Sequence, residues 1–255
     1  MLIDSHCHLA DKRLSGQLEE VLERSRGAGV TQWVVASASI DDWDRLLALS
    51  NTHAGVHAAF GIHPWYCDRH QTSHLLILRG FLEQAVAVGE CGLDFGPNRP
   101  TQALQENWLC QQLRLAKEFE KPVILHAYKS LDRLIAIIEQ MPGIRGVVHG
   151  FVGSRQQAER LIARGFYLGL GTMLLKSNRL RGLANELPLE ALLIESDAPD
   201  QSLDANRLNE PAVLPHILAQ LACIRAIAPE QLALQLNANA ARLFSLQTSH
   251  NGAKA

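Results

Sequence analysis

The sequence predicts an α/β protein folded as a single (β/α)₈ barrel of the TIM type. Short apolar segments recur at intervals of about 25 to 35 residues, and segments with a helical period lie between them. This alternation is typical of proteins with a parallel sheet. The 255 residues match the usual size of one such barrel. Hydrophobic residues make up 47% and charged residues 20%, as in ordinary globular proteins. We therefore expect one barrel domain over residues 1–246 and a flexible tail over 247–255.

Eight segments have the composition of buried strands. Two helices also show terminal signals: Ser15 is an expected cap before Leu18, and Ser154 is an expected cap of a helix that ends before Gly165. An open, doubly wound sheet would produce a similar order of elements and is the alternative architecture. The predicted strands contain residues 2–3, 33–35, 56–60, 85–88, 122–125, 146–148, 166–168 and 192–194.

Polar residues favour the closed barrel over the open sheet. A metal-ligating type of side chain follows nearly every predicted strand, and strand alternation places His6 and His8 on one face. In an open sheet such residues would spread along an edge, whereas a barrel gathers the carboxyl ends of all its strands around one mouth. The residues concerned are His6, His8, His63, Glu90, His126, His149 and Asp197.

Six of these residues form a candidate ligand set for metal ions. Taken singly, each has an ordinary explanation, such as a core histidine, a helix cap or an ion-pair partner. Together they give four imidazoles and two carboxylates without a thiolate, which suits Zn²⁺, Mg²⁺ or Mn²⁺. Six ligands exceed the three that one catalytic zinc takes, so we expect two divalent ions that share a carboxylate. The set is His6, His8, Glu90, His126, His149 and Asp197.

Composition narrows the class of protein further. The net charge of −2 provides no basic field for a polyanion, so nucleic acid would have to be held locally, for example by bound cations. Five cysteines without a CxxC spacing argue against a disulfide framework and a thiolate zinc site. No apolar run is long enough to span a bilayer, and the N-terminus lacks a secretory pattern. We expect a cytoplasmic, monomeric protein that does not bind membranes.

Beyond these residues, the sequence resembles the TatD family of metal-dependent deoxyribonucleases, within the amidohydrolase superfamily, from Ile3 to Phe244. The order of the matching motifs makes the resemblance specific. The motifs are Ile3-Asp4-Ser5-His6-Cys7-His8, Gly61-Ile62-His63-Pro64-Trp65, Gly89-Glu90-Cys91-Gly92-Leu93-Asp94, Pro122-Val123-Ile124-Leu125-His126, His149-Gly150-Phe151, Glu195-Ser196-Asp197-Ala198-Pro199, Asn209-Glu210-Pro211 and Asn237-Ala238-Asn239-Ala240-Ala241-Arg242-Leu243-Phe244.

The resemblance implies a role for each residue of the set. His6, His8 and Asp197 would bind one metal ion, His126 and His149 would bind a second ion, and Glu90 would bridge the two. His63 would contact the substrate or handle protons at the mouth, and Asn209-Glu210-Pro211 would shape the loop beyond the last strand.

The implied reaction is hydrolysis of a phosphodiester bond in DNA by a metal-activated water. Asp197 would take the proton from the water, with Glu90 and His63 as further catalytic residues, and Glu195 would support a ligand histidine. One alternative keeps the site but changes the substrate to a small amide, lactone or phosphate ester. The least favoured alternative is a non-catalytic metal- or nucleic-acid-binding protein, because a decayed site would have lost at least one ligand.

The chain departs from the family pattern at two places. Ser196 stands where the family usually has Thr, which keeps the hydroxyl. Tyr128 and Lys129 stand where the family usually has an Arg two residues after the histidine of the fifth strand. A planar guanidinium that could bind two phosphate oxygens is therefore missing.

This difference gives a prediction about phosphate recognition. Tyr128→Arg should raise kcat/KM on an oligodeoxynucleotide by roughly tenfold, the equivalent of one charged hydrogen bond. Small neutral esters should react no faster. Both substrates are assayed with wild type and variant at fixed salt and metal, and a flat or lower rate on DNA would show that position 128 is not part of a phosphate site.

Overall fold

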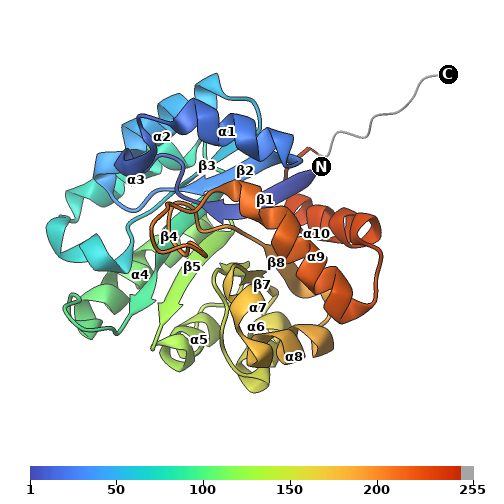
Figure 1. The fold of residues 1–255 in the computed structure, drawn as a ribbon. Helices are drawn as coiled ribbons and strands as arrows, with labels where there is room; N and C mark the ends of the chain where they lie inside the picture. Colours follow the sequence, from blue (N-terminus) through green and yellow to red (C-terminus); the bar gives the residue numbers. More distant parts are fainter. Residues whose placement is uncertain (248–255) are drawn as a thin grey trace.

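The barrel prediction is confirmed in a computed structural model, which describes residues 1–247. Eight parallel strands pair in sequence order from β1 to β8. Helices surround them on the outside (Figure 1). The strands are β1 (Leu2–Cys7), β2 (Val30–Ala36), β3 (Val56–Phe60), β4 (Ala87–Asp94), β5 (Val123–Tyr128), β6 (Gly146–Val148), β7 (Phe166–Leu170) and β8 (Leu192–Ile194). Residues 248–255 of the predicted tail lie outside the described residues.

The α-helices mostly connect one strand to the next. Four 3₁₀ helices join them: η1 (Lys12–Leu14), η2 (Pro64–Arg69), η3 (Leu189–Ala191) and η4 (Pro211–Val213). The α-helices are α1 (Leu18–Gly27), α2 (Ile40–Thr52), α3 (Ser73–Leu82), α4 (Gln102–Glu118), α5 (Leu131–Glu139), α6 (Arg155–Ala163), α7 (Met173–Lys176), α8 (Asn178–Glu186), α9 (Leu214–Arg225) and α10 (Pro229–Phe244). Within residues 1–247 no single helix is long and apolar enough to cross a membrane; α9 and α10 with the preceding η4 reach that length only together, across a 110° bend.

Several strands extend further than the sequence predicted. His6, Glu90 and His126 lie inside β1, β4 and β5 rather than directly after them. The β4–β5 pairing continues past Glu90 until Asp94 lies opposite Tyr128. Polar side chains are tolerated within these strands because they point into the mouth of the barrel, where they have each other as partners.

The two helix-start predictions had different outcomes. Ser154 caps α6 through a reciprocal capping box with Gln157, and Gly165 follows the helix with φ +79°, as expected. The Ser15 prediction was wrong. The 3₁₀ turn η1 lies between β1 and α1, and the Ser15 hydroxyl donates back to the carbonyl of Lys12. α1 begins at Leu18 without a side-chain cap.

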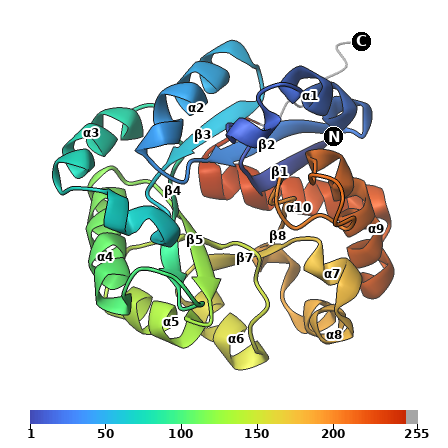
Figure 2. The same ribbon diagram turned by 60° about the vertical axis from the view of Figure 1, so that its left-hand side comes forward.

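The interior of the barrel is filled by apolar side chains from most of the strands, with two from β2, and is closed at its amino-terminal end by α10. Figure 2 shows this helix lying across one end of the barrel. Because side chains alternate along each strand, every second residue can point inward, and these residues form an inner apolar layer. The layer and the plug consist of Ile3, Val34, Ala36, Ala59, Ala87, Ile124, Val147, Leu193, Ala240, Leu243 and Phe244.

Two asparagines of α10 fasten this plug to the backbone. The side chain of Asn237 accepts from the Ile3 amide at 3.1 Å and donates to the Met1 carbonyl at 2.9 Å. Asn239 donates to the carbonyls of Leu189 and Leu192 at 2.7 and 2.9 Å. Both amides thereby satisfy buried backbone groups where β1 and β8 begin. The motif at residues 237–244 is therefore structural.

The barrel closes between β8 and β1 through hydrogen bonds at the carboxyl ends of these strands. The Asp197 amide donates to the His6 carbonyl at 3.1 Å, and the His8 amide donates to the Ala198 carbonyl at 2.6 Å. Beneath them, the Ser196 hydroxyl donates to the buried Asp4 carboxylate at 2.6 Å. Burial raises the pKa of Asp4 to about 8. A hydroxyl at position 196 thus connects β8 to β1, which explains why Ser is an adequate substitute for Thr.

The α10 plug gives a prediction about stability. Phe244→Ala should lower the free energy of unfolding by about 3–5 kcal/mol, because a buried aromatic ring is lost and a cavity remains. Leu234→Ala on the same helix is the matched control: Leu234 is 71% exposed, and its loss should change stability by under about 0.5 kcal/mol. Denaturant unfolding followed by circular dichroism measures both. Equal effects of the two substitutions would contradict the plug.

Candidate metal centre

All six predicted ligand residues and His63 gather at the carboxyl ends of the strands. A cavity of ≈ 660 Å³ opens there, and its wall contains His8, His63, Glu90, His126, His149 and Asp197. His6 lies beneath this wall and is fully buried. The predicted convergence of these side chains is therefore what the fold produces.

Glu90 occupies the middle of the cluster, and its two oxygens face different groups of histidines. Oε2 lies 3.0 Å from His8 Nε2 and 3.5 Å from His6 Nε2. Oε1 lies 2.7 Å from His149 Nε2 and 3.1 Å from His126 Nδ1. One carboxylate thus connects two pairs of imidazoles.

Asp197 lies nearest to the first pair, and it also shares a triad of ligand atoms with His6 and His149. Its Oδ1 is 3.2 Å from His6 Nε2 and 3.6 Å from His8 Nε2. The residue follows β8 with φ +57°, a left-handed conformation that Asp tolerates better than most residues. This turn directs the carboxylate over the mouth, where the side chain remains partly accessible, whereas Glu90 and His6 are almost entirely buried.

Glycines give the backbone room around this cluster. A Cβ atom at Gly92, which has φ +144°, would lie 2.1 Å from the His126 carbonyl oxygen, so only glycine lets β4 approach β5 here. A Cβ atom at Gly169 would lie 2.2 Å from Glu195 Oε2. The bare backbone of β7 therefore makes the space in which Glu195 lies beside His149.

The outer nitrogen of two histidines meets an obligatory acceptor, which fixes the ring tautomer. His8 Nδ1 lies 3.0 Å from the Ala36 carbonyl and His126 Nε2 lies 3.2 Å from Asp94 Oδ2, so each outer nitrogen carries the proton. The inner nitrogens lie 3.0 and 3.1 Å from Glu90, and with a metal ion bound each ring would be neutral and would present its lone pair there. The outer nitrogen of His149, Nδ1, also faces an acceptor, Glu195 Oε1, at the longer distance of 3.5 Å.

His63 has the opposite arrangement. Its Nδ1 accepts a hydrogen bond from the Trp65 backbone amide at 3.1 Å, so the proton of the neutral ring is on Nε2. That Nε2 lies 3.4 Å from Glu90 Oε1. Burial lowers the pKa of His63 to about 4, which keeps the ring neutral. His63 therefore offers the centre a hydrogen-bond donor rather than a lone pair.

The two central carboxylates are ionised. Burial alone would raise the pKa of Glu90, but His149 and the other imidazoles outweigh burial and hold that pKa well below its usual range. Burial opposes ionisation of Asp197 as well, yet the contact with His6 and the other imidazoles lowers its pKa. Two buried negative charges therefore face five imidazoles, those of His6, His8, His63, His126 and His149.

These residues fit divalent cations. His6 Nε2 and Glu90 Oε1 are buried without a well-formed hydrogen bond to any part of the chain that the structure describes. Orphaned polar atoms of this kind are costly unless another partner, such as a metal ion, satisfies them. The donor set is nitrogen and oxygen, as expected. Three triads have ligand atoms close enough to share an ion: His6, His8 and Glu90; His6, His149 and Asp197; and His63, Glu90 and His126.

The other predicted residues take different positions. Glu195 is fully buried and accepts a hydrogen bond from the Gly150 amide beside His149. Tyr128 is 48% exposed and lies outside the wall of the cavity. Lys129 lines a second, neighbouring cavity. The structure thus does not bring Tyr128 into the centre.

Sequence reasoning gave no role to Asp94, which orients His126. Its carboxylate also accepts from the Trp65 indole at 2.5 Å and from the Gly96 amide at 2.7 Å. The signal was available, because Asp94 lies on the same face of β4 as Glu90, four residues later. A second omission, Arg13, had no signal. It makes two hydrogen bonds to Asp200, 187 residues away, at 2.9 and 2.7 Å.

Comparisons with known proteins agree with this geometry. Residues 3–245 match the family model described as TatD related DNase. The chain is 36% identical over 253 residues to the uncharacterized metal-dependent hydrolase YjjV of Escherichia coli, covering 96% of this chain and 98% of that protein. It is 34% identical to the 3'-5' ssDNA/RNA exonuclease TatD of Cronobacter sakazakii, with 95% and 97% coverage. The crystal structure of Escherichia coli YjjV superposes with a TM-score of 0.91 at 35% identity, covering 96% and 98% of the two chains.

The fold and the site define a metal-dependent hydrolase built on a (β/α)₈ barrel. The chain belongs to the TatD-related DNase family.

Proposed function

We propose that this enzyme hydrolyses phosphodiester bonds in nucleic acid, with DNA as the first substrate to test, by means of two divalent ions. The observation that carries the proposal is the position of Glu90, whose two carboxylate oxygens face two separate pairs of histidines. A relative named as a 3'-5' ssDNA/RNA exonuclease, 34% identical over nearly the whole chain, supports the choice of substrate.

We assign the residues to two ions by their contacts with the two oxygens of Glu90. His6, His8 and Asp197 would hold one, His126 and His149 would hold the other, and Glu90 would contact both. Zn²⁺, Mg²⁺ and Mn²⁺ all suit this mixture of donors. Bound there, the ions would activate a water molecule for attack and neutralise charge on the phosphate.

Asp197 is the proton acceptor of this proposal. Its carboxylate is ionised, and it lies at the edge of the cavity, where a water molecule can reach it. Glu90 and Glu195 are less suited, because they are almost fully buried and enclosed by imidazoles or backbone amides. Proton transfer thus falls to the one central carboxylate that faces the cavity with some exposure.

His63 serves as a donor to the substrate. The Trp65 amide occupies Nδ1, so the Nε2 hydrogen points toward the centre and would meet a phosphate oxygen. A neutral imidazole gives up this proton reluctantly, so the role of His63 is stabilisation of developing charge rather than acid catalysis. The same constraint makes His63 a poor ligand despite its place in one of the three triads.

A small substrate is the second candidate. Arg13 is the one cation in the cavity wall within the described part of the chain, and Asp11 and Asp200 both bind it. A wall without a free cation favours a small phosphate ester, amide or lactone over a long polyanion. Turnover of an oligonucleotide compared with a panel of small esters discriminates the two. The cytoplasmic location and the monomeric state stay predictions.

The first prediction from this proposal concerns metal content. Wild type should bind close to two divalent ions per chain, and Glu90→Gln should weaken both, because the carboxylate charge that both share is lost. Inductively coupled plasma mass spectrometry after dialysis gives the stoichiometry. Glu20→Gln on the exposed face of α1 is the matched control and should keep both ions. Saturation of wild type at one ion, unchanged in Glu90→Gln, would refute the bridged pair.

The second prediction concerns proton transfer. Asp197→Asn should reduce kcat by several orders of magnitude, because a ligand charge and the proton acceptor are lost together while the barrel stays folded. Asp204→Asn, on the same exposed loop after β8, should retain wild-type turnover. Steady-state kinetics at saturating metal measures both. A variant at position 197 that keeps more than about a tenth of kcat, a loss under 1.4 kcal/mol, would place the base elsewhere.

A further inference from the structure

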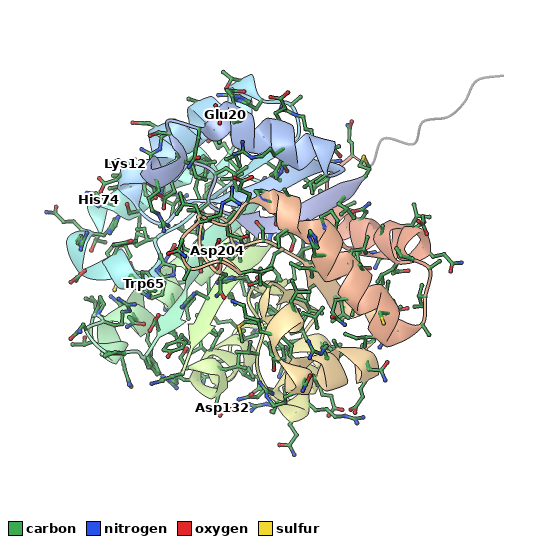
Figure 3. The ribbon with its side chains drawn as sticks, in the orientation of Figure 1. Lys12, Glu20, Trp65, His74, Asp132 and Asp204 are labelled. Atoms are coloured by element: carbon green, nitrogen blue, oxygen red, sulfur yellow. The ribbon has the colours of Figure 1, made fainter. Side chains whose placement is uncertain are left out.

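A second cavity of ≈ 510 Å³ lies beside the metal centre, on the same face of the barrel. The segments that follow β4, β5 and β6 enclose it. His149 belongs to the walls of both cavities, so the second cavity begins where the metal centre ends. Figure 3 labels one residue from each wall, Trp65 from the first cavity and Asp132 from the second.

The two cavities differ in available positive charge. In the first, Arg13 is bound by two aspartates. In the second, Arg133 is bound by Glu106 at 2.7 and 2.6 Å, but Lys129 makes no ion pair with any carboxylate of residues 1–247. The Lys129 ammonium lies 5.5 Å from the centre of the Tyr128 ring, a spacing that allows cation–π attraction. The second cavity therefore has at its edge a lysine outside any described ion pair, while the carboxylate in the same wall, Asp132, is bound by Gln157.

The remaining wall of the second cavity suits a nucleoside better than a second phosphate. Aromatic and aliphatic residues contribute much of it, and an apolar wall of this kind accepts a base or a sugar. Two polar side chains at the exposed rim of the wall already contact each other, because Gln157 donates to Asp132 at 2.8 Å. The apolar members of the wall are Phe95, Ala127, Leu131, Val148, Phe151 and Val152.

We propose that this second cavity is a subsite for the nucleotide next to the cleaved bond, with Lys129 bound to the neighbouring phosphate. The inference rests on the proposed nuclease function, and it adds the path that the bound strand takes away from the metal centre. A strand whose scissile phosphate lies at Glu90 would continue past His149 into the second cavity. The enzyme would then distinguish a chain of nucleotides from an isolated phosphodiester.

The test compares two substrates that differ in the neighbouring phosphate. Bis(p-nitrophenyl) phosphate has one phosphodiester and none beside it, whereas a short single-stranded oligodeoxynucleotide has several. Lys129→Ala should raise KM for the oligonucleotide by about threefold to tenfold and lower its salt-dependence slope by about 0.7, the value for one phosphate contact on a single strand. Kinetics on bis(p-nitrophenyl) phosphate should stay unchanged, and Lys129→Arg should restore the oligonucleotide KM.

Lys117→Ala is the control for net charge, since Lys117 is an exposed lysine of α4 that lines neither cavity. An oligonucleotide KM that is unaffected by Lys129→Ala would overturn the subsite. Equal losses on both substrates would overturn it too, because Lys129 would then act on the reacting phosphate. Wild-type protein that is loaded with metal but cleaves neither substrate would instead refute the proposed function.

Discussion

The arrangement of the centre depends on one buried carboxylate, that of Glu90. An ionised carboxylate inside a barrel is strongly unfavourable unless charges or donors surround it. Here His8, His126 and His149 approach its oxygens within 2.7–3.1 Å and come from three other strands. The ends of these strands must therefore keep fixed positions relative to one another. The rest of the fold holds them in those positions.

Two features of the barrel maintain this register. At the amino-terminal end, α10 fills the interior and binds the backbone through Asn237 and Asn239. At the carboxyl-terminal end, the buried Asp4–Ser196 hydrogen bond and the backbone bonds on either side of it connect β8 to β1. His6 and Asp197 lie on opposite sides of this seam, 3.2 Å apart. The contacts that close the barrel thus also bring these two site residues together.

The groups around the imidazoles decide what each histidine can do. His8 and His126 face acceptors on their outer side, the Ala36 carbonyl and Asp94, which leaves a lone pair for the centre. His63 faces a backbone donor, which leaves a hydrogen for the centre. Chemically identical side chains thereby separate into candidate ligands and a substrate donor. Neither assignment follows from the identity of the residue alone.

The sequence by itself determined the barrel and the members of the site, because both depend on short-range patterns. Alternation in Asp4-Ser5-His6-Cys7-His8 places both histidines on one face, and a polar residue at a strand end must lie at the mouth once the barrel closes. Ser154 and Gly165 could likewise be assigned as helix ends, since capping is local. The extent of β4 and the failure of the Ser15 cap were not predictable, because strand pairing and the η1 turn decided them.

Only the tertiary structure decided the position of each of these residues and the groups that it contacts. Glu90 is central because four strands direct histidines toward it, and the Arg13–Asp200 contact joins residues 187 positions apart. Tyr128 follows His126 by two residues on the same face of β5, yet it lies outside the wall of the first cavity and Lys129 lines the second. Sequence spacing determines the face of a strand, whereas the curvature of the barrel and its loops determines which cavity that face borders.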